Sequence, residues 1–290
     1  MATILVTGSN GQLGNEISLI SKEYGQHEFL MTDVDKLNIT SLPQLKKLFN
    51  NYKVDYIINC AAYTDVDKSE EDRKEAEKVN ITGVTNLAKL AANYQIKMFH
   101  ISTDYVFDGN TPIPYSEEMS ANPVGVYGQT KYKGEVEARR HTQTIVIRTS
   151  WLYSKFGKNF VKTILSLAAT KPEISVVFDQ VGSPTYAHDL AYAIINIIDR
   201  NEKDPAVFKP GTYHYANEGL CSWYDFAVEI VYQAGSPCKV IPIRSEEFPK
   251  PAKRPNYSVL DKKKFRQTFG IEIPYWRYSL IKCLNELVTK

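Results

Sequence analysis

A glycine-rich turn between a strand pattern and a helix pattern is the strongest constraint on how this chain can fold. Residues 3–8 form an apolar run typical of a buried strand, and a helix pattern follows at roughly 11–24. The turn between them contains Gly8, Gly11 and Gly14. Glycines at such a turn let the backbone approach a pyrophosphate at the N-terminus of the helix. The order of strand, glycine turn and helix therefore predicts a dinucleotide site.

Strand and helix patterns go on alternating through the first 150 residues. Further strands are predicted at 28–33, 55–62, 97–103 and 144–151, and further helices at 41–52, 69–94 and 127–141. This alternation predicts an α/β fold built on a doubly wound parallel sheet of the Rossmann type.

The rhythm loosens after Trp151, where prolines become frequent. Helix patterns are still present at about 159–170, 187–200, 223–234 and 276–288. We expect an NAD(P)-binding Rossmann domain over 1–150 and mainly a sugar-nucleotide substrate lobe over 151–290, smaller and also α/β. Some segments of the second half are expected to return to the first domain.

Composition excludes several other classes of protein. The chain has 290 residues, 43% of them hydrophobic, and a formal net charge of +2. These values suit a globular enzyme and give no sign of a nucleic-acid partner. The N-terminus lacks the pattern of a signal peptide and no apolar run reaches transmembrane length, so we expect a cytoplasmic protein without a membrane partner. The four cysteines and five histidines show no metal-ligand spacing, and no metal site is predicted from them.

An acidic residue ends the second strand pattern. The carboxylate of Asp33 can accept hydrogen bonds from the adenosine ribose hydroxyls and repels a 2′-phosphate. Its neighbours Thr32 and Val34 carry no positive charge, so we expect NADH to be favoured over NADPH, with dual use permitted. The other residues expected to contact the cofactor, besides the three glycines, are Gln12, Leu13, Asn38, Ile39, Ala61, Ala62, Tyr63, Tyr127 and Lys131.

The segment Tyr127-Gly-Gln-Thr-Lys131 places a phenol and an ammonium four residues apart, on one face of a helix. A neighbouring lysine is expected to lower the phenol pKa from about 10 towards neutrality, which suits proton transfer to or from a carbonyl or alcohol. Thr103 ends the fourth strand pattern, so Thr103, Tyr127 and Lys131 are the candidate catalytic residues. A second copy, Tyr278 to Lys282, follows no strand-end hydroxyl and is interpreted as helix surface.

Together these motifs resemble the extended short-chain dehydrogenase/reductase family. That family carries a glycine turn, a Ser/Thr on the fourth strand and a Tyr-x-x-x-Lys motif, and Val79-Asn80-Ile-Thr-Gly83 is similar to its helix motif with an organising asparagine. The sugar-nucleotide dehydratases of the family carry Asp-Glu after the strand-four threonine. Here Asp104 is followed by Tyr105, which favours carbonyl reduction over elimination of water.

Several segments resemble the dTDP-4-dehydrorhamnose reductase branch of that family. They are Ser102-Thr-Asp-Tyr-Val-Phe-Asp-Gly109, Val126-Tyr-Gly-Gln-Thr-Lys131, Arg148-Thr-Ser-Trp151, Asn159-Phe160, Asp179-Gln180, Gly182-Ser-Pro-Thr185, Trp223-Tyr-Asp225 and Arg254-Pro255. The resemblance implies reduction by NAD(P)H of the C4 ketone of dTDP-4-dehydro-β-L-rhamnose to dTDP-L-rhamnose, a donor for cell-wall or capsule polysaccharide.

The same resemblance implies roles for individual residues. Tyr127 would donate the proton, Lys131 would bind the nicotinamide ribose, and Thr103 would hold the substrate oxygen. The implied substrate-binding residues are Ser102, Thr103, Asp104, Trp151, Asn159, Trp223 and Arg254. The tryptophan rings would contact the deoxysugar or thymine, and the arginine would pair with the diphosphate.

Two other functions stay open at this point. One is another nucleotide-sugar reductase or epimerase of the same family, and the other is a non-catalytic dinucleotide-binding subunit that resembles the β subunit of methionine adenosyltransferase. Some relatives hold a divalent metal at a homodimer contact through acids. Glu16 and Glu286 match two such positions, whereas His188 stands where a third acid would be needed.

Overall fold

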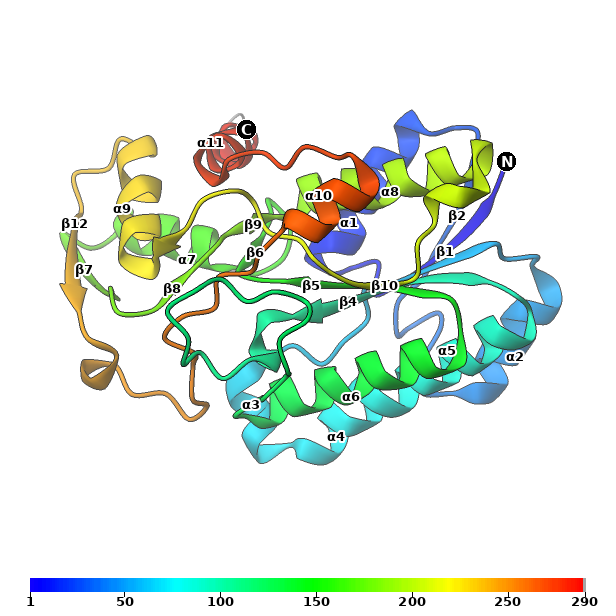
Figure 1. Cartoon of the computed structure of the whole chain (residues 1–290). Coiled ribbons are helices and arrows are strands. Elements are labelled where there is room, and N and C mark those ends of the chain that lie inside the picture. Colours follow the sequence, from blue (N-terminus) through cyan, green and yellow to red (C-terminus); the bar gives the residue numbers. More distant parts are fainter. Residues whose placement is uncertain (289–290) are drawn as a thin grey trace.

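A six-stranded sheet forms the centre of the computed structural model, which describes residues 1–288 (Figure 1). In spatial order its strands are β10 (Gly211–His214), β5 (Thr144–Thr149), β4 (Lys97–Thr103), β3 (Tyr56–Asn59), β1 (Thr3–Thr7) and β2 (Glu28–Met31). Every neighbouring pair is parallel. The predicted doubly wound α/β fold is therefore confirmed.

Helices cover both faces of this sheet (Figure 1). One face is packed by α1 (Gln12–Ile20), α8 (Ala187–Lys203) and α10 (Lys263–Phe269), and the other by α2 (Leu42–Asn51), α5 (Val84–Asn93) and α6 (Val126–His141). Each face packs against its own helices in a separate apolar core. Because the strands are buried on both faces, they carry apolar side chains on both sides. The chain after residue 150 contributes α8, α10 and β10 to this part of the molecule.

The single long helix predicted over 69–94 is wrong. The structure has α3 (Val66–Glu71), α4 (Arg73–Glu77), a π-helical segment (Lys78–Gly83) and then α5. Asp72 starts α4 because its side chain accepts a hydrogen bond from the backbone N–H of Glu75, so the chain turns there. In the π-helical segment the amide of Asn80 is hydrogen-bonded to both backbone groups of Tyr63, which lies within the loop between β3 and α3. The break therefore ties this helix to the edge of the sheet where the site lies.

A smaller lobe lies at one side of the sheet and has an apolar core of its own, which includes Phe226 and Trp276 (Figure 1). Its helices are α7 (Phe160–Ala168), α9 (Trp223–Gln233) and α11 (Trp276–Val288). Its strand pairs are β7 (Glu173–Val177) with β12 (Lys239–Ile243), β6 (Leu152–Tyr153) with β9 (Thr185–Tyr186), and β8 (Val181–Gly182) with β11 (Cys221–Ser222). The last two residues of the lobe predicted over 151–290 lie outside the described residues.

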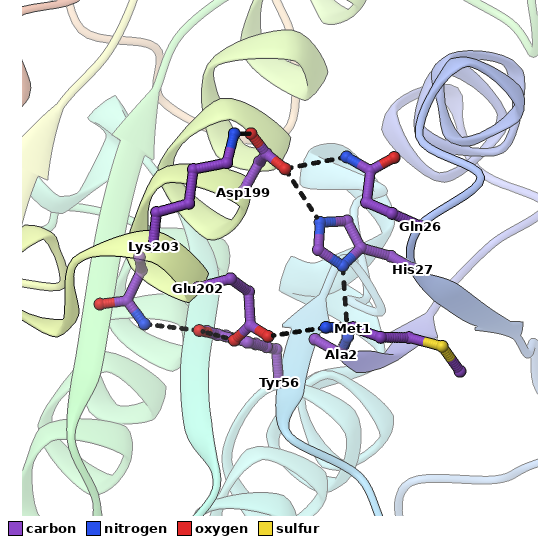
Figure 2. A network of polar contacts seen from close by, with 9 residues as sticks. Met1, Ala2, Gln26, His27, Tyr56, Asp199, Glu202 and Lys203 are labelled. Atoms are coloured by element: carbon purple, nitrogen blue, oxygen red, sulfur yellow. Dashed lines mark hydrogen bonds and ion pairs between the residues drawn. The ribbon is translucent and has the colours of Figure 1, made fainter.

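A polar network fastens α8 to the amino ends of the central strands (Figure 2). Asp199 of α8 lies 3.4 Å from Nε2 of the buried His27, whose Nδ1 accepts a hydrogen bond from the backbone N–H of Ala2. Glu202, one turn later, accepts a hydrogen bond from the hydroxyl of Tyr56. These contacts hold α8 at the end of the sheet opposite to the cavity described below.

The helices of the structure are short. The longest within residues 1–288 is α8, with 17 residues. In that part of the chain no helix combines the length and the apolar character needed to cross a lipid bilayer.

Replacement of Ile194 by Ala should reduce stability strongly. Ile194 is fully buried in α8, in the core cluster that also contains Ile17 of α1 and Ile4 of β1. The lost burial and the cavity left behind should lower the free energy of unfolding by about 2–5 kcal/mol in urea denaturation. Tyr192 lies on the same helix and is 48% exposed. Tyr192→Ala is therefore the control and should lower the free energy of unfolding by less than about 1 kcal/mol. Equal losses in the two variants would contradict this account of the core.

Candidate active site

A cavity of about 750 Å³ lies along the carboxyl edge of the sheet. Its wall combines the glycine turn after β1 with the segments that follow three other strands, at 60–64, 101–105 and 149–152. In an open α/β sheet this edge is where ligands bind, because the parallel strands deliver their loops to the same side.

Two glycines of the turn are packed so closely against backbone that neither position has room for a side chain. Gly8 has a φ of +67°, and a Cβ there would lie 2.6 Å from the backbone nitrogen of Ala61. A Cβ on Gly14 would lie 2.5 Å from the carbonyl oxygen of Gly8. Gly11 precedes α1 and supplies no side-chain cap, so the helix presents its first N–H groups to the cavity. This backbone cradle fits the diphosphate of a dinucleotide, through N–H groups and the helix dipole.

Asp33 faces the same end of the cavity. One carboxylate oxygen accepts a hydrogen bond from the backbone N–H of Asn10 (2.9 Å), and the other from that of Val34 (2.7 Å). The carboxylate is therefore held beside the glycine turn. The cavity wall contains every residue that the sequence predicted to contact the cofactor, namely Gly8, Gly11, Gln12, Leu13, Gly14, Asp33, Asn38, Ile39, Ala61, Ala62, Tyr63, Tyr127 and Lys131.

Thr103 and Tyr127 meet at the other end of the cavity. Thr103 is the last residue of β4, and Tyr127 opens α6, whose first residue is Val126. The hydroxyl of Thr103 donates a hydrogen bond to Asp104 (3.0 Å). The ring of Tyr105 packs edge-on against the ring of Tyr127, with centroids 5.5 Å apart, and so limits where the phenol can move.

The expected lowering of the Tyr127 pKa is wrong for this structure. Burial raises the pKa of Tyr127 to about 12, hydrogen bonding to Thr103 opposes the rise, and the charge of Asp104 adds to it. The ammonium of Lys131 donates a hydrogen bond to the carbonyl oxygen of Ile101 (2.6 Å) instead of the phenol. Burial also lowers the pKa of Lys131 to about 8. At neutral pH the phenol is thus protonated, as a proton donor must be, and most of the lysine is still charged.

Asp104 and Ser102 differ in what they can offer a substrate. Burial raises the pKa of Asp104 to about 6, and hydrogen bonding to Ser258 and Thr103 opposes the rise. Asp104 lines the cavity, but its Oδ2 is itself buried in the wall. Ser102 also lines the cavity, and its hydroxyl donates a hydrogen bond to Glu135 (2.5 Å).

The rings of the two tryptophans are stacked on each other beside the cavity. Trp151 lines the cavity, and its ring stacks on that of Trp223 with centroids 3.6 Å apart and planes 10° apart. Trp223 packs in turn against Phe160. Trp151 is therefore part of the cavity wall, whereas Trp223 supports its ring from behind and is not among the lining residues.

Asn159 and Arg254 also lie away from the cavity wall. The amide of Asn159 caps α7 and donates a hydrogen bond to the side chain of Gln12 (2.9 Å), which is at the start of α1. The guanidinium of Arg254 makes two hydrogen bonds to Asp67 (3.2 and 2.9 Å). Both side chains are thus engaged with other groups of the chain, and direct substrate contact by either one stays a prediction.

The sequence analysis missed several residues of the cavity wall as site residues, among them Cys60 and Lys158. Cys60 stands next to Ala61 at the end of β3, and its place at a strand end was a usable signal. Lys158 comes from the loop before α7, and no local pattern marks it. Its neighbour Gly157 packs against Gln12, since a Cβ there would lie 3.1 Å from that side chain. The long-range contacts of Gly157 and Asn159 with Gln12 hold this loop, and with it Lys158, at the cavity wall.

The acids that could match a metal site in relatives have other partners here. Glu16 is fully buried, accepts the hydroxyl of Ser154 (2.5 Å) and lies 3.1 Å from Nδ1 of His188. Glu286 forms an ion pair with Lys155. No group of three metal-ligating side chains occurs within residues 1–288. Within the described chain, therefore, Glu16 is held by Ser154 and His188, and Glu286 by Lys155.

The fold and the cavity define a Rossmann-type dinucleotide-binding protein. Residues 1–289 match the family described as the RmlD substrate binding domain, and the chain belongs to that family. It is 38% identical to the spore coat polysaccharide biosynthesis protein SpsK of Bacillus subtilis, over 99% of this chain and 98% of that protein. It is 36% identical to the dTDP-4-dehydrorhamnose reductase of Escherichia coli K12, over 99% of this chain and 98% of that one.

Solved structures show the same similarity. A dTDP-4-dehydrorhamnose reductase from Clostridium acetobutylicum superposes with a TM-score of 0.92 and 43% identity, covering 98% of this chain and 99% of the other. The dTDP-4-dehydrorhamnose reductase of Bacillus anthracis, solved in complex with NADP, has a TM-score of 0.92 and 37% identity with the same coverage.

Gly14→Val should weaken binding of the dinucleotide about tenfold or more. Even the first carbon of the new side chain would meet the carbonyl of Gly8 and the backbone of Ser9 at 2.5 Å, so the turn must move. Affinity is measured by fluorescence titration with NADH and NADPH, and circular dichroism checks the fold. Gly25→Ala is the matched control, since nothing lies within 4 Å of a Cβ there. Unchanged affinity in Gly14→Val would contradict the placement of the cofactor on this turn.

Proposed function

We propose that this protein uses NAD(P)H to reduce the C4 ketone of dTDP-4-dehydro-β-L-rhamnose, which gives dTDP-L-rhamnose. The observation that carries the proposal is the meeting of Thr103, Tyr127 and Lys131 in one cavity with the glycine turn. Full-length similarity to proteins named dTDP-4-dehydrorhamnose reductase supports the substrate, and the NADP complex of the Bacillus anthracis relative supports the cofactor.

The residues that would hold the cofactor follow the wall of the cavity. The N–H groups after Gly11 would bind its diphosphate, Asp33 its adenosine ribose and Lys131 its nicotinamide ribose. When bound, the cofactor supplies the hydride that converts the ketone carbon to an alcohol carbon.

The chain's own residues complete the reduction. The hydroxyl of Thr103 would hold the substrate oxygen next to Tyr127. As negative charge develops on that oxygen, the protonated phenol of Tyr127 would donate its proton and form the alcohol. The nearby ammonium of Lys131 would stabilise the resulting phenolate until water restores the proton.

The remaining substrate contacts divide between the two parts of the chain. We propose that residues 1–150 hold the cofactor and that the lobe formed mainly by 151–290 holds the sugar nucleotide. Trp151 would form the wall against the deoxysugar or thymine, and Trp223 would keep that ring in place. Arg254 would bind the diphosphate only after release from Asp67.

Turnover of enzymatically prepared dTDP-4-dehydrorhamnose, followed as cofactor oxidation, tests the proposed function. A panel of dTDP-, GDP- and UDP-linked 4-keto sugars measures the substrate preference. Turnover of a different nucleotide sugar alone would replace the proposed substrate. A protein inert on the whole panel that recovers a partner enzyme would instead be a regulatory subunit.

Tyr127→Phe should retain cofactor binding but lose about 10²-fold or more of kcat, because the phenol hydroxyl is the proton donor. The second Tyr-x-x-x-Lys motif provides a matched control. Tyr278 is 65% exposed on α11, and Tyr278→Phe should have the kcat of the parent protein. Near-parental turnover in Tyr127→Phe would rule out the assigned role.

We also propose that the parent protein has a lower KM for NADH than for NADPH, because the charge of Asp33 repels a 2′-phosphate. Asp33→Asn removes this charge at nearly constant shape and should lower the KM for NADPH relative to that for NADH. Asp35→Asn is the control, since Asp35 is exposed and lies outside the cavity wall. A parent preference for NADPH would contradict this assignment.

A further inference from the structure

A buried ion pair lies directly behind the catalytic residues, between α6 and the strands β4 and β5. Glu135 of α6 has no exposed surface, and Arg148 of β5 is 3% exposed. The guanidinium donates two well-formed hydrogen bonds to the carboxylate, Nε to Oε1 at 2.9 Å and Nη2 to Oε2 at 2.8 Å. The same Oε1 accepts the hydroxyl of Ser102 from β4, which is opposite Arg148 in the strand register.

This ion pair continues the row of catalytic residues along α6. Tyr127, Lys131 and Glu135 follow one another at intervals of four residues, so they share one face of the helix. Lys131 is hydrogen-bonded to the carbonyl of Ile101, and Glu135 to the side chain of the next residue, Ser102. Two successive turns of α6 are therefore fastened to two successive residues at the carboxyl end of β4.

Glu135 also affects the charge of Lys131. Burial lowers the pKa of Lys131, and the carboxylate of Glu135 opposes this by raising it. Two other titratable groups face the ammonium, Cys60 from the end of β3 and His100 from β4. Burial raises the pKa of Cys60 to about 12 and lowers that of His100, so both groups are neutral near pH 7.

Charged groups also face Tyr127 and Glu135, the other two residues of this row on α6. Asp104 faces Tyr127 and raises the pKa of that phenol. Arg148 faces Glu135, and its guanidinium also lies over the ring of Phe107, 5.1 Å from the centroid. The Nη1 atom of Arg148 has no hydrogen-bond partner in the described part of the chain. The carboxylate of Glu135 is thus the group that balances a buried guanidinium next to a buried ammonium.

We propose that Glu135 is a positioning residue of the reaction, which fixes α6 against β4 through Ser102 and keeps Lys131 as an ammonium next to Tyr127. Ser102, which lines the cavity, then acts by holding Glu135 and not as a substrate ligand. The inference rests on the proposed function, since it assigns Glu135 to the same Tyr127 and Lys131 that would carry out the reduction.

The charge balance predicts a shift in the pH profile of kcat/KM. In Glu135→Gln, Lys131 faces the uncompensated cation of Arg148 and no longer has a neighbouring carboxylate, so it loses its proton at lower pH. The alkaline limb of the profile should move to lower pH by about one unit. In the double variant Glu135→Gln/Arg148→Met both charges are absent, and the limb should return towards that of the parent.

The matched control is Glu137→Gln. Glu137 lies on the same helix but pairs with His141 and Arg140 at the surface. An unchanged limb in Glu135→Gln, or an equal shift in Glu137→Gln, would overturn the proposal. A lower yield of folded protein without a shift would likewise show a structural role only.

Ser102→Ala keeps the experiment decisive where Glu135→Gln does not fold, because it removes one hydrogen bond and no charge. The proposal expects a lower kcat with the parent KM for the sugar. A raised KM with unchanged kcat would return Ser102 to substrate binding and overturn the proposal.

The pH dependence of NADPH affinity separates this inference from the proposed function. It is measured by fluorescence in the parent, Glu135→Gln and Glu137→Gln proteins, and it requires no sugar. A parent protein that turns over no 4-keto sugar would refute the proposed function, whereas the alkaline limb of NADPH binding would still test Glu135. That limb should shift to lower pH in Glu135→Gln alone.

Discussion

The parallel pairing of β1, β3, β4 and β5 is the constraint on which the rest of the site depends. Because these strands run in the same direction, the glycine turn and the segments after the other three strands all open on one edge of the sheet. The row of Thr7, Asn59 and His100 shows how firmly neighbouring strands are held. Their side chains are hydrogen-bonded in succession across three strands, at 2.7 and 3.0 Å. A change of register would separate the groups that have to converge.

Burial, more than pairwise contact, sets the chemistry of the candidate site. It raises the pKa of Tyr127 to about 12 and of Asp104 to about 6, and lowers that of Lys131 to about 8. At neutral pH the phenol of Tyr127 is therefore neutral. The carboxyl group of Asp104 titrates closer to neutral pH than a free carboxyl group does, and the ammonium of Lys131 loses its proton more readily than a free lysine does. Such shifts are frequent at functional sites, because the water that would stabilise charge has been removed.

The central domain could be predicted in detail, whereas the roles of several lobe residues could not. The strands and the glycine turn are encoded by local pattern, and so are Asp33 and the pair of Tyr127 and Lys131. The break near Asp72 was missed because a charged helix and two short capped helices have similar composition. The partners of Asn159 and Arg254 lie 147 and 187 residues away, in Gln12 and Asp67. Contacts over such separations have no local signal.

The sequence by itself determined the class of fold, the place of the dinucleotide turn and the candidate catalytic residues, because each depends on periodicity or short spacing. Only the tertiary structure decided which side chains reach the cavity. It paired Arg254 with Asp67 and stacked Trp223 on Trp151, and neither Arg254 nor Trp223 lines the cavity. It also reversed the expected pKa shift of Tyr127, since that shift depends on how much water the surrounding segments exclude. Burial and partner choice are properties of the packed chain, and short spacing along the sequence does not encode them.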